Sequence, residues 1–462
     1  MTFDLARSDT ICALATGSAP AAIAVVRVSG THADEVRARV FRARRVRPEQ
    51  PAFTATLGDV VDAHGAVIDE AVCTRFPAGR SYTGEASFEL SVHGSPLRVR
   101  ATLRALVAAG CRLAQPGELT LRAVLTGRMD LCAAEAVDDV VHARSDAAAR
   151  AALRTLRGGL KDALAPAREA LIDALAEIEA RLDFPDEDLG DARRRELAAS
   201  LANAHEALAR LLSTSTWGRR LHEGARVVLY GPPNAGKSTL FNALLSEERA
   251  LVHADPGTTR DVLEVPLVIG DIAVTLIDVA GVRPLTDAGE VERLGIARAH
   301  GERARADIVV ALVPADSQNA AAQARALGGH IAVVSKCDLA AAHSVAGTSQ
   351  AGAGADAAPA ALALSAKSGR GLDELRARIA ALLAQEKLGD EEVVLMRERQ
   401  VAHVSDAAEA LTLSLAALSE DRAGEVIASE LRRAARALDR LLGSDIDADV
   451  LDRVFSRFCI GK

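Results

Sequence analysis

Arg226-Val-Val-Leu-Tyr230 runs directly into Gly231-Pro-Pro-Asn-Ala-Gly-Lys-Ser238, and these two segments decide the fold of the central part of the chain. The first is a short apolar run typical of a buried strand. The second, the phosphate loop, matches the pattern G-x-x-x-x-G-K-[ST], and a helix is predicted to follow it from Lys237 to Leu245. In this context backbone N–H groups and the helix N-terminus face bound phosphates. We predict that Lys237 contacts the β- and γ-phosphates of a nucleotide and that Ser238 binds Mg²⁺.

Two later segments are spaced to complete the contacts to the metal and the γ-phosphate. The segment Gly257-Thr-Thr-Arg-Asp261 begins 19 residues after Ser238, and its Thr259 is predicted to bind the same Mg²⁺. An apolar strand is expected to end at Asp278, the first residue of an Asp-Val-Ala-Gly motif. The carboxylate of Asp278 would hold the water shell of the metal, and the N–H of Gly281 would contact the γ-phosphate.

Two further strand ends carry the residue types that recognise guanine. In Ser335-Lys-Cys-Asp338, the carboxylate of Asp338 can accept both the N1 and N2 hydrogens of guanine, a pair that adenine does not offer. Ser365-Ala-Lys367 would contact the guanine O6. Two positions depart from the usual motifs of such proteins, because Ser335 replaces an Asn and Val279 replaces a Thr. We expect the serine to reach less far than the amide and to weaken nucleotide binding.

The predicted nucleotide site therefore draws on five segments of the chain. Its residues are Asn234, Ala235, Gly236, Lys237, Ser238, Thr239, His253, Ala254, Asp255, Pro256, Gly257, Thr258, Thr259, Asp278, Val279, Ala280, Gly281, Ser335, Lys336, Cys337, Asp338, Ser365, Ala366 and Lys367. Together they predict a GTP hydrolase of the Ras-like α/β class.

Around the phosphate loop the pattern alternates between strand and helix. Residues 262–269 and 272–277 flank Gly270-Asp271, which is a two-residue hairpin signal. Later strands are expected at 308–313, 331–334 and 362–364. Residues 345–360, rich in Gly, Ala and Ser, are interpreted as a flexible insertion.

The flanking regions follow other patterns. Near the N-terminus, strands are predicted at 23–28, 67–76 and 88–92, and a helix at 96–109. Apolar residues at helical spacing, such as Leu171, Ile172 and Ile178, mark the stretch before the phosphate loop, and a helical pattern returns near the C-terminus. We predict an α/β domain at 1–118, a discontinuous helical domain at 119–223 and 386–462, and a G domain inserted between its parts at 224–385.

Composition restricts the functional class further. The 462 residues carry a net charge of −8, so a partner is expected to supply much of the positive surface if RNA is the substrate. The six cysteines form no C-x-x-C pair, which argues against a structural zinc site. No apolar run reaches about 18 residues and the first residues lack a signal-peptide pattern. We expect a cytoplasmic protein with reduced cysteines and no membrane segment.

Several motifs resemble one family, the tRNA-modifying GTPases of the MnmE/TrmE type, and they extend over essentially the whole chain. They are Asp9-Thr-Ile-Cys-Ala-Leu-Ala-Thr16, Val26-Arg-Val-Ser-Gly30, Tyr82-Thr-Gly-Glu85, Phe88-Glu-Leu90, His93-Gly94, Pro116-Gly-Glu-Leu-Thr-Leu-Arg122, Gly127-Arg-Met-Asp-Leu131, Ala134-Glu-Ala136, Asp183-Phe-Pro-Asp186, Gly257-Thr-Thr-Arg-Asp-Val262, Val291-Glu-Arg293 and Phe458-Cys-Ile-Gly-Lys462. The last of these, with its terminal Cys-x-Gly-Lys, is highly specific to the family.

The resemblance implies potassium-dependent GTP hydrolysis activated by dimerisation of the G domains. It also implies a homodimer that works with an FAD-dependent MnmG-type subunit, as a heterotetramer or larger assembly. The complex modifies C5 of the wobble uridine in certain tRNAs and takes the carbon from a tetrahydrofolate in its 5-formyl or 5,10-methylene form. By the same resemblance the N-terminal domain is of the folate-binding type and holds the homodimer together.

Site residues follow from the same resemblance. The folate-contacting positions are Arg27, Glu89, Arg128 and Lys462, although Arg128 stands where a lysine is usual and Gly17-Ser-Ala-Pro-Ala-Ala22 lacks the usual glycines. Simpler interpretations stay open. Arg27 would be an edge arginine in water, Glu89 would face solvent, and the other two would be ordinary surface charges.

The resemblance also assigns a potassium site and two catalytic residues. K⁺ would be held by Asn234, His253, Asp255 and Thr258. Glu292 would orient the attacking water, and Cys459 would take part in the modification chemistry. The alternatives are a turn residue for Asn234, an exposed helix position for Glu292, and inert packing for Cys459.

Two other functions compete with this interpretation. One is an Era- or EngA-like switch that assists ribosome assembly, but such proteins carry an RNA-binding domain or a tandem G domain, for which this sequence has no signal. The other is a degenerate adaptor that keeps the dimer scaffold but hydrolyses GTP poorly, as the departures at Ser335 and Val279 suggest.

Overall fold

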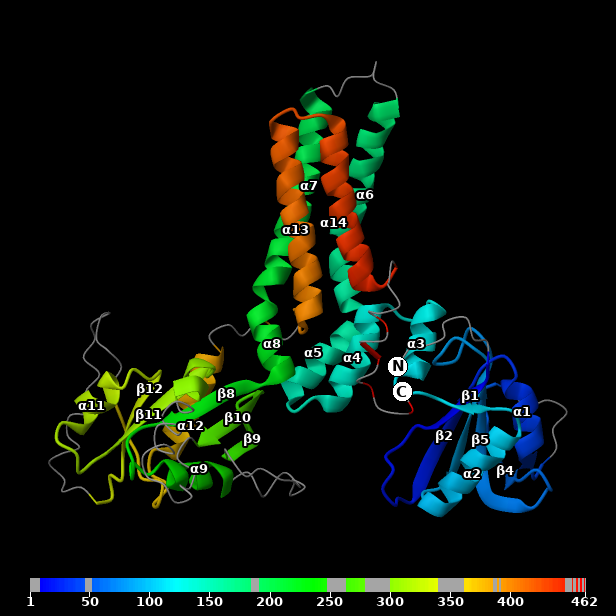
Figure 1. The fold of residues 1–462 in the computed structure, drawn as a ribbon, viewed down its shortest axis with the longest axis horizontal. Helices are drawn as coiled ribbons and strands as arrows, with labels where there is room; N and C mark the ends of the chain where they lie inside the picture. The colour runs from blue at the N-terminus through cyan, green and yellow to red at the C-terminus, as the bar shows by residue number, and fades with distance from the viewer. Residues whose placement is uncertain are drawn as a thin grey trace, which may run out of the picture. The chain divides into compact units, whose positions relative to one another are not determined.

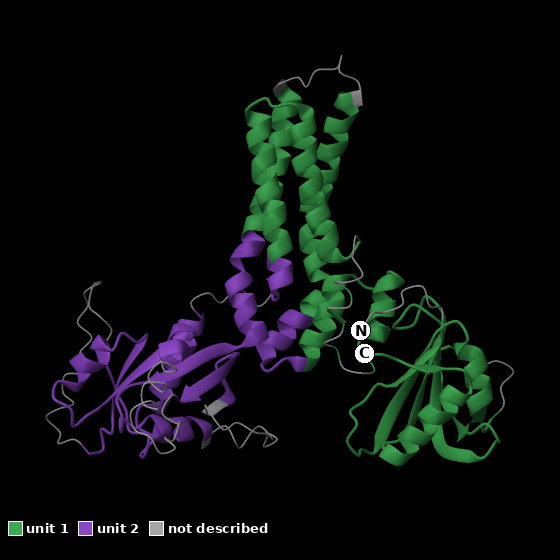
Figure 2. Ribbon diagram, in the orientation of Figure 1, with its two compact units in different colours: residues 1–141, 153–209, 402–462 green, residues 142–152, 210–401 purple. Residues whose placement is uncertain are grey.

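The computed structural model describes most of the chain and divides it into two compact units. The described residues are 9–45, 52–183, 191–246, 263–278, 300–339, 361–384, 389, 392–444, 451, 454, 455, 458 and 461. The first unit comprises 1–141, 153–209 and 402–462, and the second comprises 142–152 and 210–401 (Figure 2). The second unit is therefore inserted into the sequence of the first.

The N-terminal part of the first unit is a seven-stranded sheet with the order β3-β4-β5-β6-β2-β1-β7. Its strands are β1 (Ile11–Leu14), β2 (Ile23–Ser29), β3 (Phe41–Ala43), β4 (Ala55–Val61), β5 (Val67–Phe76), β6 (Ser87–His93) and β7 (Arg112–Leu113). All neighbours are antiparallel except β1 and β7. Helices α1 (Ala33–Val40) and α2 (Pro96–Ala108) pack their apolar side chains on one face of the sheet (Figure 1).

The predicted strands at 23–28, 67–76 and 88–92 and the helix at 96–109 are confirmed. Strands β1, β3, β4 and β7 were not predicted. In β4, Gly58 interrupts the apolar alternation. The structure gives the reason for this glycine. A side chain at Gly58 would collide with the backbone of Arg42 and the ring of Phe41 on β3.

The rest of the first unit is helical. Its helices are α3 (Glu118–Leu125), α4 (Leu131–His142), the end of α5 (Asp146–Leu156), α6 (Gly159–Asp183), most of α7 (Asp191–Ser213), most of α13 (Glu398–Ser419) and α14 (Gly424–Leu442). The long helices α6, α7, α13 and α14 run alongside one another in a bundle (Figure 1). Of the residues that predicted a helix here, Leu171 and Ile178 of α6 are buried, whereas Ile172 is 42% exposed and lies at the edge of the apolar face.

Among the described residues, α13 is the one helix long and apolar enough to pass a composition test for crossing a membrane. The core helix of a water-soluble bundle passes the same test. In the structure, 44% of the apolar window of α13 is buried. Its Asp406 forms an ion pair with Arg433 of α14. These contacts are those of a bundle helix.

The second unit contains a six-stranded sheet with the order β13-β12-β11-β8-β10-β9. Its strands are β8 (Ala225–Tyr230), β9 (Leu263–Ile269), β10 (Ile272–Asp278), β11 (Ile308–Pro314), β12 (Ile331–Ser335) and β13 (Leu362–Ala363). Besides parts of α5, α7 and α13, the helices of this unit include α8 (Ser215–Glu223), α9 (Lys237–Ser246), α11 (Ala320–Ala326) and α12 (Leu372–Leu383).

Every strand pair of this sheet is parallel except the β9–β10 hairpin, which turns at Gly270 with φ of 63°. The strands, the hairpin and the helix predicted in this region are confirmed. In open parallel sheets of this kind, ligands bind beyond the carboxyl ends of the strands. The insertion expected at 345–360 lies outside the described residues.

Candidate functional site

The phosphate loop leaves the carboxyl end of the central strand β8 and enters α9. Gly231 is required at its start, because a side chain there would collide with the carbonyl oxygen of Leu312 on β11. Asn234 and Gly236 have φ angles of 61° and 87°, which place both in the left-handed region. Left-handed residues in such a loop let successive N–H groups converge on an anion.

Lys237 extends back over the loop from the first turn of α9. Its side chain is buried, and its ammonium group donates hydrogen bonds to the carbonyl oxygens of Gly231 and Pro232, both at 2.8 Å. Burial lowers the pKa of Lys237, and the nearby carboxylate of Asp278 opposes this effect. A positive charge is thus held where the β- and γ-phosphates of a nucleotide are predicted to lie.

The two described residues predicted to act at Mg²⁺ are in direct contact. Ser238 donates a hydrogen bond of 2.6 Å from its hydroxyl to Asp278, which is fully buried at the end of β10. A hydroxyl and a carboxylate are the hard oxygen donors that Mg²⁺ prefers, so this pair fits the metal. The third predicted residue, Thr259, lies outside the described residues.

The residues predicted to recognise guanine meet at the ends of β12 and β13. The Ser365 hydroxyl donates a 2.6 Å hydrogen bond to the carboxylate of Asp338, and this bond lowers the pKa of Asp338. The backbone N–H of Cys337 bonds to the carbonyl oxygen of Leu364 at 3.2 Å, which ties the two segments together. Asp338 is therefore ionised and oriented at the edge of the site, as recognition of guanine requires.

Several predicted site residues lie outside the described residues. They are His253, Ala254, Asp255, Pro256, Gly257, Thr258, Thr259, Val279, Ala280, Gly281, Glu292, Cys459 and Lys462. Their assignments remain predictions from the sequence.

The described residues predicted to contact folate lie in the first unit. Arg27 of β2 and Glu89 of β6 face each other across the sheet and form an ion pair, with Nε of Arg27 at 2.8 Å from the carboxylate. The guanidinium of Arg27 also stacks over the ring of Tyr82, 4.9 Å from its centre. Arg128 donates a hydrogen bond of 3.2 Å to the carbonyl oxygen of Ser81, the neighbour of Tyr82. Arg27 and Glu89 are therefore partners in a half-buried pair rather than separate solvated charges.

Gly461, near the C-terminus, lies in the same part of the unit. Gly461 is buried, has φ of 96°, and lies so close to the carbonyl oxygen of Leu14 at the end of β1 that a side chain would collide with it. Leu14 pairs with Val26, the neighbour of Arg27. Gly461 is thus held one strand away from the Arg27–Glu89 pair.

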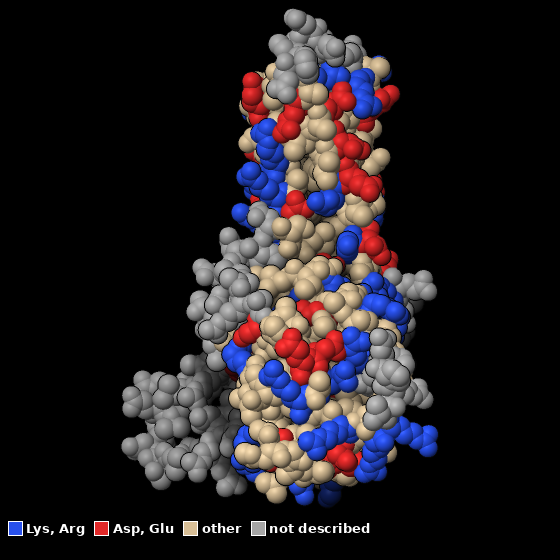
Figure 3. Space-filling model, turned by 90° about the vertical axis from the view of Figure 1, so that its right-hand side faces the viewer, with Lys and Arg blue, Asp and Glu red and all other residues tan. Residues whose placement is uncertain are grey.

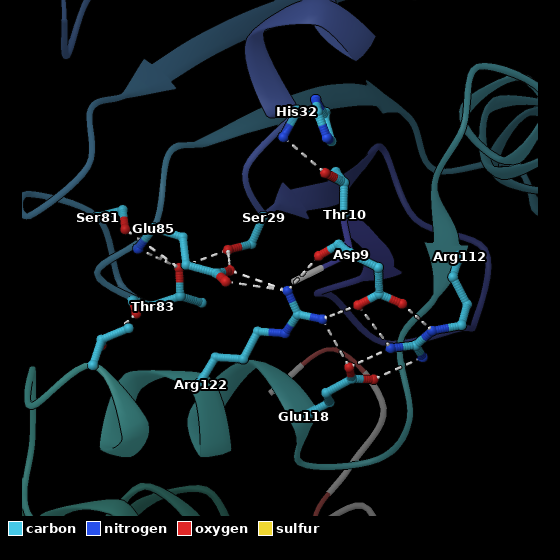
Figure 4. Close-up of polar contacts among 11 residues, drawn as sticks. Asp9, Thr10, Ser29, His32, Ser81, Thr83, Glu85, Arg112, Glu118 and Arg122 are labelled. Carbon is cyan, nitrogen blue, oxygen red and sulfur yellow. Dashed lines mark hydrogen bonds and ion pairs between the residues drawn. The ribbon is translucent and has the colours of Figure 1, made fainter. Parts of the chain in front are cut away.

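A polar cluster around Arg122 holds Glu85, in the turn before β6 (Figure 4). Arg122 is 9% exposed and bonds to Asp9 at 2.6 Å, to Glu118 at 3.1 Å and to Glu85 at 3.2 Å. Arg112 pairs with the same Asp9 and Glu118. Asp9, Glu85, Glu118 and Arg122 lie in motifs that carry the family resemblance, but no role was predicted for them. Nothing local in the sequence shows that residues 113 positions apart, such as Asp9 and Arg122, meet.

This cluster leads to a prediction about acid stability. Burial disfavours ionisation of Asp9 and Glu118, but hydrogen bonds from the two arginines outweigh it and hold the pKa of both carboxyls below its usual value. A lowered folded-state pKa contributes stability above the unfolded pKa, which is lost as pH falls through the folded value. Hydrogen exchange of β1 and β6 amides is therefore expected to show constant stability from about pH 7 to 5 and a loss below about pH 4.

The variant Arg122→Met tests the cause. It removes the cation that three carboxylates share and leaves only Arg112 to pair with Asp9 and Glu118, so local stability at pH 7 should fall by about 3 kcal/mol. The remaining carboxyl pKa values should then rise, so acidification from about pH 6 to 4 should restore stability in the variant. The control Arg98→Met removes an exposed arginine that donates a hydrogen bond to the carbonyl oxygen of Ile68. Equal pH profiles for the Arg122 variant and the unaltered protein would rule out this role for the cluster.

Comparison with known proteins gives a consistent result over the whole chain. Residues 131–459 match the family described as MnmE helical domain, and residues 10–128 match the one described as GTP-binding protein TrmE N-terminus. A protein of Symbiobacterium thermophilum named tRNA modification GTPase MnmE is 40% identical, over 98% of this chain and 99% of its own length. Proteins of the same name from Thermus thermophilus and Azoarcus sp. are 41% and 40% identical, over 98% of this chain and 99% and 98% of their own lengths.

Proposed function

From the premise that the chain belongs to the MnmE family of tRNA modification GTPases, we propose that its GTP hydrolysis is potassium-dependent and drives a folate-supplied modification at C5 of the wobble uridine. The observation that carries the GTPase part is the Ser238–Asp278 contact beside the buried ammonium of Lys237. It assembles the metal-binding oxygens and the phosphate-binding cation at the end of β8.

At the nucleotide site, the protein contributes position and charge rather than covalent chemistry. Lys237 holds the β- and γ-phosphates, Asp338 fixes the base, and Ser238 and Asp278 hold Mg²⁺ or its water shell. Bound Mg²⁺ supplies charge neutralisation between the phosphates. Glu292 is proposed to orient the attacking water, and Gly281 to donate its N–H to the γ-phosphate.

We propose that K⁺ takes the place that an arginine finger fills in other GTPases, where such a charge contributes about 10³–10⁵ in rate. Asn234 supports this assignment, because its side chain offers a neutral oxygen and its left-handed backbone lies at the bend of the phosphate loop. His253, Asp255 and Thr258 are proposed to complete the potassium shell.

For the first unit we propose a tetrahydrofolate site built on the Arg27–Glu89 pair, with Arg128 and Lys462. A folate offers ring N–H donors and tail carboxylates, which match a glutamate acceptor and several cationic donors. Two observations support a single site. The turn at Ser81 and Tyr82 contacts both Arg27 and Arg128, and Gly461 next to Lys462 packs against β1. Cys459 in the same tail is proposed to act in the modification.

The proposed assembly is a cytoplasmic homodimer with an FAD-dependent MnmG-type subunit. Residues 1–118 would hold the dimer and the folate, 119–223 and 386–462 would form the helical domain, and 224–385 would hydrolyse GTP. On one face of the first unit, basic and acidic side chains are interspersed (Figure 3). This mixture supports the proposal that the partner supplies much of the basic surface that binds tRNA. A surface of mixed charge gives little net attraction to phosphates.

One reconstituted reaction tests this function. The purified chain, an MnmG-type partner, FAD, tRNA transcript, a one-carbon tetrahydrofolate and GTP are combined with Mg²⁺, in KCl or NaCl. Released phosphate and the modified uridine, detected by mass spectrometry, are the readouts. We expect at least about 10-fold faster GTP hydrolysis in KCl, no hydrolysis of ATP, and modified uridine only when folate and partner are both present.

Variants and individual outcomes of this reaction test the parts of the proposal separately. The variant Arg27→Ala should abolish modification and leave GTP hydrolysis unchanged, whereas Arg98→Ala, an exposed arginine of α2, should alter neither. Hydrolysis that is equal in both salts would refute the potassium site alone. Nucleotide binding without hydrolysis would favour the degenerate adaptor, and hydrolysis without modification in the complete mixture would favour a ribosome-assembly switch.

A further inference from the structure

We infer that Ser335 is a positioning residue that makes no contact with the base. It ties residues 335–338, here called the guanine-reading segment, to the phosphate loop. This inference rests on the proposed GTP site and assigns a task to the residue by which this chain departs from the usual Asn-Lys-x-Asp motif. Recognition of the base would then depend on Asp338 and its neighbours instead of residue 335.

The hydroxyl of Ser335 is committed to the protein backbone. The side chain is 3% exposed at the end of β12, and its Oγ donates a 2.6 Å hydrogen bond to the carbonyl oxygen of Ala235 in the phosphate loop. A second carbonyl, that of Val313, lies 3.4 Å away. A serine has a single hydrogen to donate, so the short bond to Ala235 uses it.

The bond lies where the two halves of the nucleotide site meet. Ala235 is fully buried between Asn234 and Gly236, the two left-handed residues of the loop. Lys336, with φ of 57°, follows Ser335, and its side-chain carbons pass within 4 Å of where a side chain on Gly236 would begin. Residues 335 and 336 thus rest on the peptide segment whose N–H groups would hold the phosphates.

The same short segment carries the base-reading carboxylate. Asp338 stands three residues beyond Ser335 and is oriented by the hydroxyl of Ser365. A shift of the phosphate loop away from Ser335 would therefore also change the distance between the phosphate and base contacts. An asparagine amide has two donor hydrogens and an acceptor, so it can bond to this carbonyl and still donate to a base acceptor such as N7. Serine keeps only the first of these two bonds.

The test measures the binding of GDP and of 7-deaza-GDP, which lacks the N7 acceptor, by the full-length chain. In the unaltered protein the two affinities should be equal within about twofold. Ser335→Ala leaves the carbonyl of Ala235 buried without its donor, so both affinities should fall about 10-fold while their ratio stays the same. Ser335→Thr, which keeps the hydroxyl, should recover most of the loss. Ser335→Asn should favour GDP over 7-deaza-GDP by at least about threefold.

Circular dichroism and thermal unfolding show whether each variant is folded, and Ser317→Ala, a serine in the turn after β11, is the matched control. Unchanged affinities in a folded Ser335→Ala variant would overturn the inference. So would a preference for GDP over 7-deaza-GDP in the unaltered protein that disappears in Ser335→Ala. A failure of the unaltered protein to bind GDP would instead count against the proposed GTP site.

Discussion

Replacing Lys237 with alanine is expected to lower the rate of GTP hydrolysis by about 100-fold or more. Removing one preorganised protein group that stabilises the charge of a transition state typically causes a loss of about this size. The charge on the transferring phosphoryl oxygens is stabilised by cations held in fixed positions. Lys237 is such a cation, because two carbonyl oxygens of the loop and burial fix its ammonium group. Phosphate release under single-turnover conditions, with GTP and Mg²⁺ in KCl, measures the effect.

The variant Lys161→Ala is the control, because it removes an exposed lysine from α6 in the other unit and should hydrolyse GTP at the normal rate. Nucleotide binding should be measured separately with a fluorescent GDP analogue. A Lys237→Ala protein that is folded, binds GTP and hydrolyses it within about threefold of the normal rate would show that the ammonium group does not stabilise the transition state.

The nucleotide unit was the easier part to predict, because its signals are local in the sequence. The run 226–230, the phosphate loop and the hairpin at Gly270 each lie within a few residues of the structure they specify. Glycines are also informative, because they mark positions where a side chain would collide with a neighbour or where the backbone is left-handed. Gly231 lies against Leu312, and Gly270 supplies the left-handed turn between β9 and β10.

What the sequence did not reveal depends on contacts between distant segments. Glu85 and Arg122 belong to different motifs, and only folding brings them into one buried ion-pair cluster. The position of Ile172 was predicted from helical spacing alone, which cannot decide how wide the buried face of a helix is. The role of Ser335 was likewise hidden, since its partner Ala235 lies 100 residues earlier in the chain. The polar contacts that the sequence did not reveal are therefore those between residues far apart in the chain.

The substitution Asp338→Asn is expected to change the preferred base from guanine to xanthine. The ionised carboxylate offers only acceptors, which match the N1 and N2 hydrogens of guanine, and the Ser365 hydroxyl holds it in place at 2.6 Å. An amide at this position offers one acceptor and one donor, which match the N1 hydrogen and the C2 carbonyl of xanthine. Because a polar site rejects a base that leaves its groups unpaired, kcat/KM for GTP should fall roughly 100- to 1,000-fold and hydrolysis of XTP should appear.

The measurement compares kcat/KM for GTP, XTP and ATP in the variant, in the unaltered protein and in Asp316→Asn. Asp316 is an exposed carboxylate beyond β11 and serves as the control, because its loss changes the charge of the same unit without touching the guanine-reading segment. ATP should stay unused by all three proteins, since adenine has neither the N1 hydrogen nor a group at C2. Loss of GTP hydrolysis without gain of XTP hydrolysis would mean that Asp338 supports the loop rather than reads the base. Selectivity against ATP would then have to come from residues 365–367, whose predicted contact with O6 would be the same for guanine and xanthine.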